Sequence, residues 1–118
     1  MNNLLAGLVI CHLCGDFLLQ TKEMAAYKNI DTSWCVAHVA WYLVPFGALF
    51  WFGGLPPWFF LLIGVQHFFQ DRFSWNLWWL RRVNGTDAAT WPLGPLCVDQ
   101  AMHLTFIGIV YGIWQLFV

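Results

Sequence analysis

Three pairs of histidine and aspartate lie four residues apart inside apolar stretches of this 118-residue chain, and a fourth histidine lies alone in another such stretch. The residues are His12 with Asp16, His67 with Asp71, Asp99 with His103, and the solitary His38. Residues four apart share one face of a helix, with about 5–6 Å between their β carbons. Imidazole and carboxylate groups together are the ligands expected for zinc, manganese or iron. Each pair could therefore hold one side of a metal ion.

The composition places these residues in a membrane protein. The chain is 60% hydrophobic and only 9% charged, whereas soluble domains carry roughly 25% charged residues. Ionisable groups within a bilayer are costly, and they persist there when they are paired, hydrated or bound to an ion. The formal net charge of −1 gives no basic patch for a nucleic acid partner. We therefore expect the lipid bilayer to be the partner.

Four apolar segments reach the length of about 20 residues that a membrane-spanning helix needs. They cover about residues 3–20, 32–52, 57–80 and 94–117. The sequence predicts the all-α class, with these segments forming a four-helix transmembrane bundle in a single domain of residues 1–118. The first segment has no basic start and no small-residue cleavage site, so we expect it to be a retained helix.

The cations predict the orientation of this bundle. All five Lys and Arg residues lie on or toward the side of the first and third connections, at about residues 21–31 and 81–92. By the positive-inside rule this side is cytoplasmic, so both termini lie on the non-cytoplasmic side. The alternating direction of the four helices then places all seven His and Asp residues in the cytoplasmic half. They are expected to form one cluster there.

The cluster has more ligands than one tetrahedral ion needs, because it holds four imidazoles and three carboxylates. Either two ions share bridging carboxylates, which we favour slightly, or some aspartates orient a histidine from outside the ligand shell. Zinc is the first expectation for the metal, with manganese and iron as alternatives. Five flanking residues are candidates for supporting the ligands or contacting a substrate: Gln20, Lys28, Gln70, Arg72 and Gln100. Among these, Lys28 and Arg72 could neutralise a phosphate or carboxylate at the interface.

The motifs resemble those of small bacterial and phage membrane proteins that are catalogued as a domain of unknown function. The resemblance rests on H-x-x-G-D-F-x-x-Q at residues 12–20, on Lys28 and His38, on the His67/Asp71 pair and on D-Q-x-x-H at residues 99–103. It covers nearly the whole chain and implies a four-helix integral membrane protein with a polar centre, and it supplies no activity. We expect the protein in the bacterial inner membrane. One departure is Arg72 directly after Asp71, where the resemblance leads us to expect lysine. A looser similarity to membrane-bound metal-dependent hydrolases favours an enzyme by analogy.

The residues allow three functions. The first is a metal-dependent hydrolase that acts on a lipid or amphiphilic ester or phosphoester at the cytoplasmic leaflet, with Asp16, Asp71 and Asp99 as ligands or general base. The second is transport or binding of a divalent cation or of protons, although the outer half of the bundle offers no ionisable side chain for conduction. The third is a small accessory subunit whose polar core is structural. Each of these functions is compatible with a homo-oligomer.

Overall fold

The computed structural model describes residues 3–118, which form helices and contain no strand. The elements are α1 (Leu4–Leu13), the π-helical η1 (Cys14–Leu18), α2 (Lys22–Tyr27), α3 (Thr32–Gly53), α4 (Pro57–Arg72), α5 (Trp75–Arg82) and α6 (Gly94–Gln115). Residues 1 and 2, which begin the predicted domain, lie outside the described residues. The predicted all-α class is confirmed.

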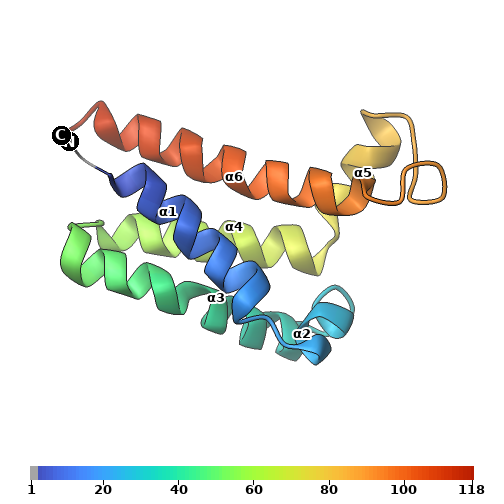
Figure 1. Cartoon of the computed structure of the whole chain (residues 1–118), viewed down its shortest axis with the longest axis horizontal. Coiled ribbons are helices and arrows are strands. Elements are labelled where there is room, and N and C mark those ends of the chain that lie inside the picture. Colours follow the sequence, from blue (N-terminus) through green and yellow to red (C-terminus); the bar gives the residue numbers. More distant parts are fainter. Residues whose placement is uncertain (1–2) are drawn as a thin grey trace.

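The four longer elements run along the long axis of the molecule, as Figure 1 shows. The short helices α2 and α5 lie at one end, and the start of α1, the turn between α3 and α4 and the end of α6 lie at the other. Local signals define α3: the Asp31 side chain accepts hydrogen bonds from two backbone amides of its first turn, and Gly54 ends it at φ 74°. Pro57 then opens α4, where a missing amide hydrogen costs nothing.

Two helices within the described residues are long and apolar enough to cross a membrane. They are α3 and α6, each of 22 residues, whereas the apolar segment formed by α1 and η1 is shorter. The sequence predicts four spans. By length and composition, two helices of the structure meet the requirements for a span. The helical path of the first predicted span ends at Leu18 rather than near residue 20.

The prediction of one helix over residues 57–80 is wrong, because the structure divides this range into two helices. The α4 helix ends at Arg72, and α5 begins at Trp75. Between them Ser74 has φ 51°, in the left-handed region, which a right-handed helix cannot pass through. With 16 residues α4 is about 24 Å long, which is less than the hydrocarbon thickness of about 30 Å.

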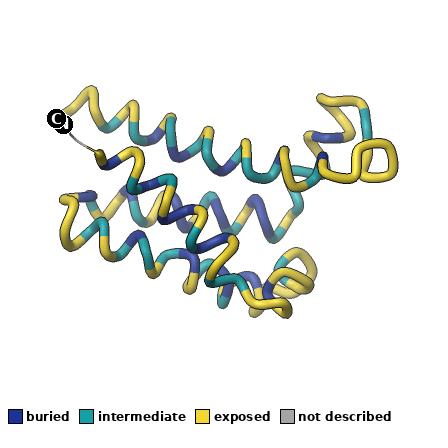
Figure 2. Tube along the Cα trace, in the orientation of Figure 1, coloured by how far each residue is buried: buried dark blue, intermediate teal, exposed yellow. Residues whose placement is uncertain are grey.

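Buried and exposed residues alternate along the longer helices (Figure 2), and the surface of the bundle carries many large apolar side chains. All four histidines are fully buried, whereas Trp51 is 79% and Phe52 92% exposed. Large apolar side chains are exposed on every one of the longer helices. Soluble monomers rarely expose large contiguous apolar surfaces, so the outside of this bundle suits contact with lipid or with other helices.

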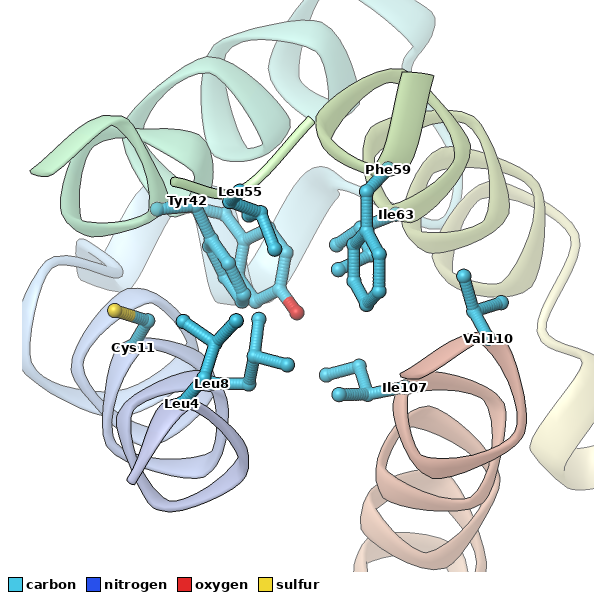
Figure 3. Close-up of a cluster of buried hydrophobic side chains, with 10 residues drawn as sticks. Leu4, Leu8, Cys11, Tyr42, Leu55, Phe59, Ile63, Ile107 and Val110 are labelled. Atoms are coloured by element: carbon cyan, nitrogen blue, oxygen red, sulfur yellow. The ribbon is translucent and has the colours of Figure 1, made fainter. Parts of the chain in front are cut away.

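The interior is divided along its length into an apolar and a polar half. Figure 3 shows the apolar half, in which side chains from α1, α3, α4 and α6 point toward one another. We call this the apolar cluster; it consists of Leu4, Leu8, Cys11, Tyr42, Phe46, Leu55, Phe59, Ile63, Ile107 and Val110. It contains no Asp, Glu, Lys, Arg or His. The polar half begins at Tyr42, toward the end that carries α2 and α5.

Candidate metal centre

The polar half holds all seven predicted His and Asp residues in one cluster. They come from four elements: α1 with η1, α3, α4 and α6. Six of the seven are buried, and Asp99 is the most open, with 15% of its side chain exposed. The structure therefore brings together residues that lie up to 91 positions apart in the sequence, from His12 to His103.

Four of these side chains point one atom each at a common centre. The Nε2 atoms of His38 and His67 lie 2.9 Å apart. Asp16 Oδ1 lies 3.2 and 3.3 Å from these two nitrogens, and Asp71 Oδ2 lies 3.1 Å from each. Ligands placed tetrahedrally about 2.0–2.1 Å from a zinc ion are about 3.3–3.4 Å from one another. Five of the six distances among the four atoms are thus close to those of a single tetrahedral site, and all four atoms lie within 4.8 Å of one another.

Hydrogen bonds among these four residues do not account for the arrangement. At 2.9 Å only one of the two facing Nε2 atoms can carry a hydrogen. Asp16 Oδ1 and both Nδ1 atoms are buried without a hydrogen-bond partner, although buried polar atoms are normally paired. The His67 ring is held instead by stacking, with centroids 3.7 Å from Tyr42 and 4.0 Å from His103. The two carboxylate oxygens and the two Nε2 atoms that converge here are suited to a cation.

A second group lies directly beside the first and consists of Asp16, Asp99 and His103, whose ligand atoms lie within 4.8 Å of one another. His103 Nε2 is 3.2 Å from Asp71 Oδ1 and 3.6 Å from Asp99 Oδ1. Asp16 belongs to both groups, and the two oxygens of Asp71 face different histidines. Asp16 and Asp71 therefore lie between the two groups, and each could contribute ligand atoms to either.

Lys28 is the one cation, among the described residues, that enters the cluster. Its Nζ lies 2.9 Å from Asp71 Oδ2 and forms an ion pair with it. The geometry of this oxygen satisfies no hydrogen bond. Burial acts to lower the pKa of Lys28, but the carboxylates of Asp71 and Asp16 raise the pKa above its usual value overall. Lys28 therefore remains an ammonium group. Arg72 lies outside the cluster, with its guanidinium donating to Thr32 Oγ1 and to a backbone carbonyl at 3.1 Å each.

The charge balance also favours a divalent ion. With neutral histidines, three carboxylates and one ammonium leave the cluster with a net charge of −2. Burying uncompensated charge in an apolar setting is expensive, so such groups normally pair, coordinate a metal or change protonation. A bound divalent cation would offset this negative charge. The residues present thus fit a metal in ligand chemistry, in spacing and in charge.

Hydrogen bonds outside the two groups hold the carboxylates in place. Tyr42 donates its hydroxyl hydrogen to His12 Nδ1 at 2.9 Å, and His12 Nε2 donates to Gln100 Oε1 at 2.7 Å. Gln100 Nε2 in turn donates to Asp16 Oδ2 at 2.8 Å. His12, which the sequence predicts as a ligand, is therefore engaged at both ring nitrogens and lies outside both groups. Gln20 donates to the backbone carbonyl of Asp16 at 3.1 Å.

Two glutamines support the second group. The fully buried Gln70 donates to the backbone oxygen and to Oδ1 of Asp99, at 3.0 Å each. Gln66 donates to Gln70 Oε1 at 2.6 Å, and its own oxygen accepts from His103 Nδ1 at 3.4 Å. This amide pair fixes the orientation of Asp99 and of the His103 ring. Such outer hydrogen bonds tune metal ligands in known sites.

The sequence analysis missed Tyr42 and Gln66. Both residues carry a signal that could have found them, since Tyr42 lies four residues after His38 and Gln66 lies four residues before Gln70. This is the same spacing that identifies the His/Asp pairs. A tyrosine and a glutamine are, however, common enough in helices that the spacing alone does not separate them from packing residues.

A local change of helix type positions Asp16. The chain switches to a π-helix at Cys14, and Leu19 N donates to Cys14 O at 2.9 Å across five residues. A Cβ at Gly15 would lie 2.6–2.9 Å from side-chain and backbone atoms of Tyr42. Glycine is therefore required for η1 to approach α3 this closely. Single π-turns of this kind are frequent at functional sites.

Gly15→Ala is expected to lower the free energy of unfolding by about 1–3 kcal/mol, because the added methyl group overpacks against the α3 backbone. Thermal unfolding of the detergent-purified protein would measure this effect. The matched control is Gly47→Ala in α3, where a Cβ meets nothing within 4 Å and alanine favours the helix. Equal stability of the two variants would show that η1 and α3 are not as close as the structure has them.

Fold and centre define an all-α protein with two helices of membrane-spanning length around a buried His/Asp cluster that could hold a metal ion. The chain belongs to the family described as protein of unknown function DUF3307, which matches residues 4–118. The resemblance drawn from the sequence motifs is thereby confirmed. No curated protein and no solved structure matches the chain.

Proposed function

We propose that this protein is an integral membrane, metal-dependent hydrolase that cleaves a lipid or another amphiphilic ester or phosphoester at the cytoplasmic leaflet. The observation that carries the proposal is the near-tetrahedral spacing of one atom each from Asp16, His38, His67 and Asp71. Zinc suits this donor set best, with manganese and iron as alternatives. The second group, with Asp99 and His103, would hold a second ion.

The membrane setting rests on the apolar outside of the bundle and on its cations. All five Lys and Arg residues lie in or near α2 and α5 or at the end of α4, at the same end of the molecule as the polar half. The positive-inside rule makes this end cytoplasmic, which agrees with a location in the bacterial inner membrane. The metal centre then lies at the depth of the cytoplasmic leaflet.

A hollow of about 310 Å³ at this end leads to the centre. We call it the polar entrance, and its polar lining residues are Lys28, Asn29, Asp71, Ser74, Asn76 and Asp99. It would admit water and a polar head group to the two carboxylates. Lys28, at its wall, offers a positive charge to an anionic group.

The chemistry follows from which carboxylate is most open. A divalent ion, when bound, would lower the pKa of water toward neutrality and polarise the ester or phosphoryl oxygen. Asp16 and Asp71 would serve as ligands. The more open Asp99 would contact the second ion through one carboxylate oxygen and take a proton from the attacking water through the other, as the water oxygen bonds to the carbonyl carbon or phosphorus. When the ester bond breaks, the same carboxyl group returns that proton to the leaving oxygen. One water is consumed for each bond cleaved.

The apolar cluster argues against the alternative of ion conduction. It fills the other half of the interior with Leu, Phe, Ile and Val side chains and, among the described residues, offers no charged or imidazole group. An ion leaving the centre in that direction would lose its ligands and its water together, which is costly in an apolar medium. A site open at only one end suits a hydrolase better than a transporter.

The proposal is tested on detergent-purified protein loaded with zinc and then reconstituted in vesicles. We expect elemental analysis to find two zinc equivalents, and vesicle assays to find metal-dependent breakdown of labelled lipid esters or phosphoesters without transmembrane flux. Flux of zinc or protons that disappears in His103→Ala, with no product formed, would replace the hydrolase by a transporter. Bound metal with neither activity would point to a structural metal in an accessory subunit.

Lys28→Met is expected to separate metal binding from catalysis. Removal of the ammonium group beside Asp71 leaves zinc binding as tight as in the wild type or tighter. A hydrogen bond to a charged group contributes about 1.5–3 kcal/mol, so hydrolysis of an anionic phosphoester should fall roughly 10- to 100-fold and that of a neutral ester much less. Steady-state kinetics on the two substrates would measure the difference. Lys22→Met, at the exposed start of α2, is the control and should change neither rate.

A further inference from the structure

An apolar groove runs between α4 and α6 on the side of the centre that faces away from α3. Its volume is about 850 Å³, and it is open along one side. We call it the α4–α6 groove; its apolar wall includes Leu62, Val65, Phe69, Met102, Phe106 and Ile109. Several of these side chains are 40–60% exposed, among them Leu62, Val65 and Ile109. No part of the described chain fills the groove.

Apart from Cys97 and Thr105 in its α6 wall, the groove has polar side chains at two places. Its cytoplasmic end is bounded by Asn84 and by Trp75, Trp79 and Trp91, and indole rings favour the membrane interface. Its floor includes Gln66 and Gln70, the two amides that hold His103 and Asp99. The groove is thus continuous with the metal centre through these amides.

The polar entrance and the α4–α6 groove meet at one hydrogen-bonded pair. Gln70 lines the groove, Asp99 lines the polar entrance, and Gln70 Nε2 donates to Asp99 Oδ1 at 3.0 Å. The apolar α4–α6 groove and the polar entrance therefore adjoin beside Asp99, the proposed general base. This division matches the two halves of an amphiphile.

Resting on the hydrolase function proposed above, we propose that the α4–α6 groove binds the acyl chain of a membrane lipid substrate. The chain lies along α6, the bond to be cleaved lies beside Gln70 and Asp99, and the head group occupies the polar entrance next to Lys28. The groove thereby selects a lipid of the cytoplasmic leaflet over a water-soluble ester.

The length and the polarity of the groove favour a lipid chain over a protein helix. From Cys97 to Ile109 along α6 the groove is about 18 Å long, similar to the roughly 15 Å hydrocarbon depth of one leaflet. It is apolar along this length and ends at Gln70, whose amide donates to Asp99 in the polar entrance. An apolar chain joined to a polar head group matches this sequence of surfaces, whereas an apolar helix would leave the polar entrance empty.

The test uses a phosphatidylglycerol whose acyl chain ends in a photoactivatable diazirine, added to the detergent-purified protein in increasing amounts. Cross-linked peptides are mapped by mass spectrometry. We expect labelling to saturate near one lipid per chain and to concentrate on α4 and α6. Ala101→Trp places a large ring in the groove and should reduce this labelling at least tenfold. Ala48→Trp, an equally exposed alanine on α3 that does not line the groove, should leave it unchanged.

Labelling that never saturates and spreads equally over α3 would show loosely surrounding lipid and overturn the inference. Saturable labelling that is unaffected by Ala101→Trp would overturn it as well. If that variant fails to fold, the positions of the cross-links in the wild type still show whether the chain lies in the α4–α6 groove. Zinc content and hydrolysis are measured in parallel. Hydrolysis by a wild type with an unlabelled groove overturns this inference alone. A saturable, labelled groove on a zinc-loaded but inactive protein supports lipid binding there and overturns the hydrolase.

Discussion

Asp16→Asn is expected to abolish zinc binding at both positions, with the dissociation constants raised more than a hundredfold. Asp16 is the carboxylate shared by the two ligand groups, and its Oδ1 faces both His38 and His67. The amide removes the negative charge while keeping the shape of the side chain. Loss of a group that only supports a ligand typically costs 10- to 100-fold in metal affinity, so loss of a shared ligand should exceed that. Elemental analysis and competition titration would measure it.

Two matched substitutions sharpen this prediction. Asp87→Asn changes an exposed loop aspartate that belongs to neither ligand group, and this variant should retain both ions. Asp99→Asn affects only the second group and should lose one ion of the two. If Asp16→Asn and Asp99→Asn lost the same amount of zinc, the carboxylates would serve a single ion and the bridging role of Asp16 would be wrong.

Removal of the metal is expected to destabilise the folded protein strongly. A ligand that binds only the folded state at a free concentration 100 times its dissociation constant stabilises that state by about 2.7 kcal/mol. A chelator removes this contribution and leaves the buried carboxylates without the charge of the cation. The midpoint of thermal unfolding, followed by circular dichroism in detergent, should therefore fall by several degrees and recover when zinc is added back.

The Asp16→Asn variant is the internal control for chelation. Because it has lost both ions, its unfolding midpoint should be the same with and without chelator. The metal centre would be contradicted by a wild-type protein that contains no metal and whose midpoint of thermal unfolding changes with neither chelator nor zinc. The polar cluster would then be a structural network that fixes the packing of the helices.

The sequence by itself predicted which seven residues gather in one cluster at one end of the bundle. The four-residue spacing of the His/Asp pairs put each pair on one helical face. The alternating direction of the apolar segments put all seven residues at one end, and the structure brings them together there. The motifs also identified the family. These features follow from local periodicity and chain direction, which the sequence contains directly.

Only the tertiary structure decided which atoms face one another. His12 has the same spacing to Asp16 as the other pairs, yet its ring bonds to Tyr42 and Gln100 instead of entering a ligand group. Lys28 and Arg72 were equal candidates, and only Lys28 reaches Asp71. Periodicity shows which residues share one face of a helix. It does not show how that face is rotated toward a neighbouring helix or how far apart the two helices lie. Those depend on packing between helices, such as the close approach of η1 to α3 that Gly15 permits.

The break between α4 and α5 was decided in the same way. Residues 57–80 read as one apolar segment, because their composition continues without a proline or glycine after Gly64. The turn at Ser74 is set by tertiary packing, in which Leu80 is buried and Asn76 donates to the Pro95 carbonyl at 3.0 Å. Contacts with a segment some 20 residues away outweighed the local preference to continue the helix, and such contacts are not encoded in local composition.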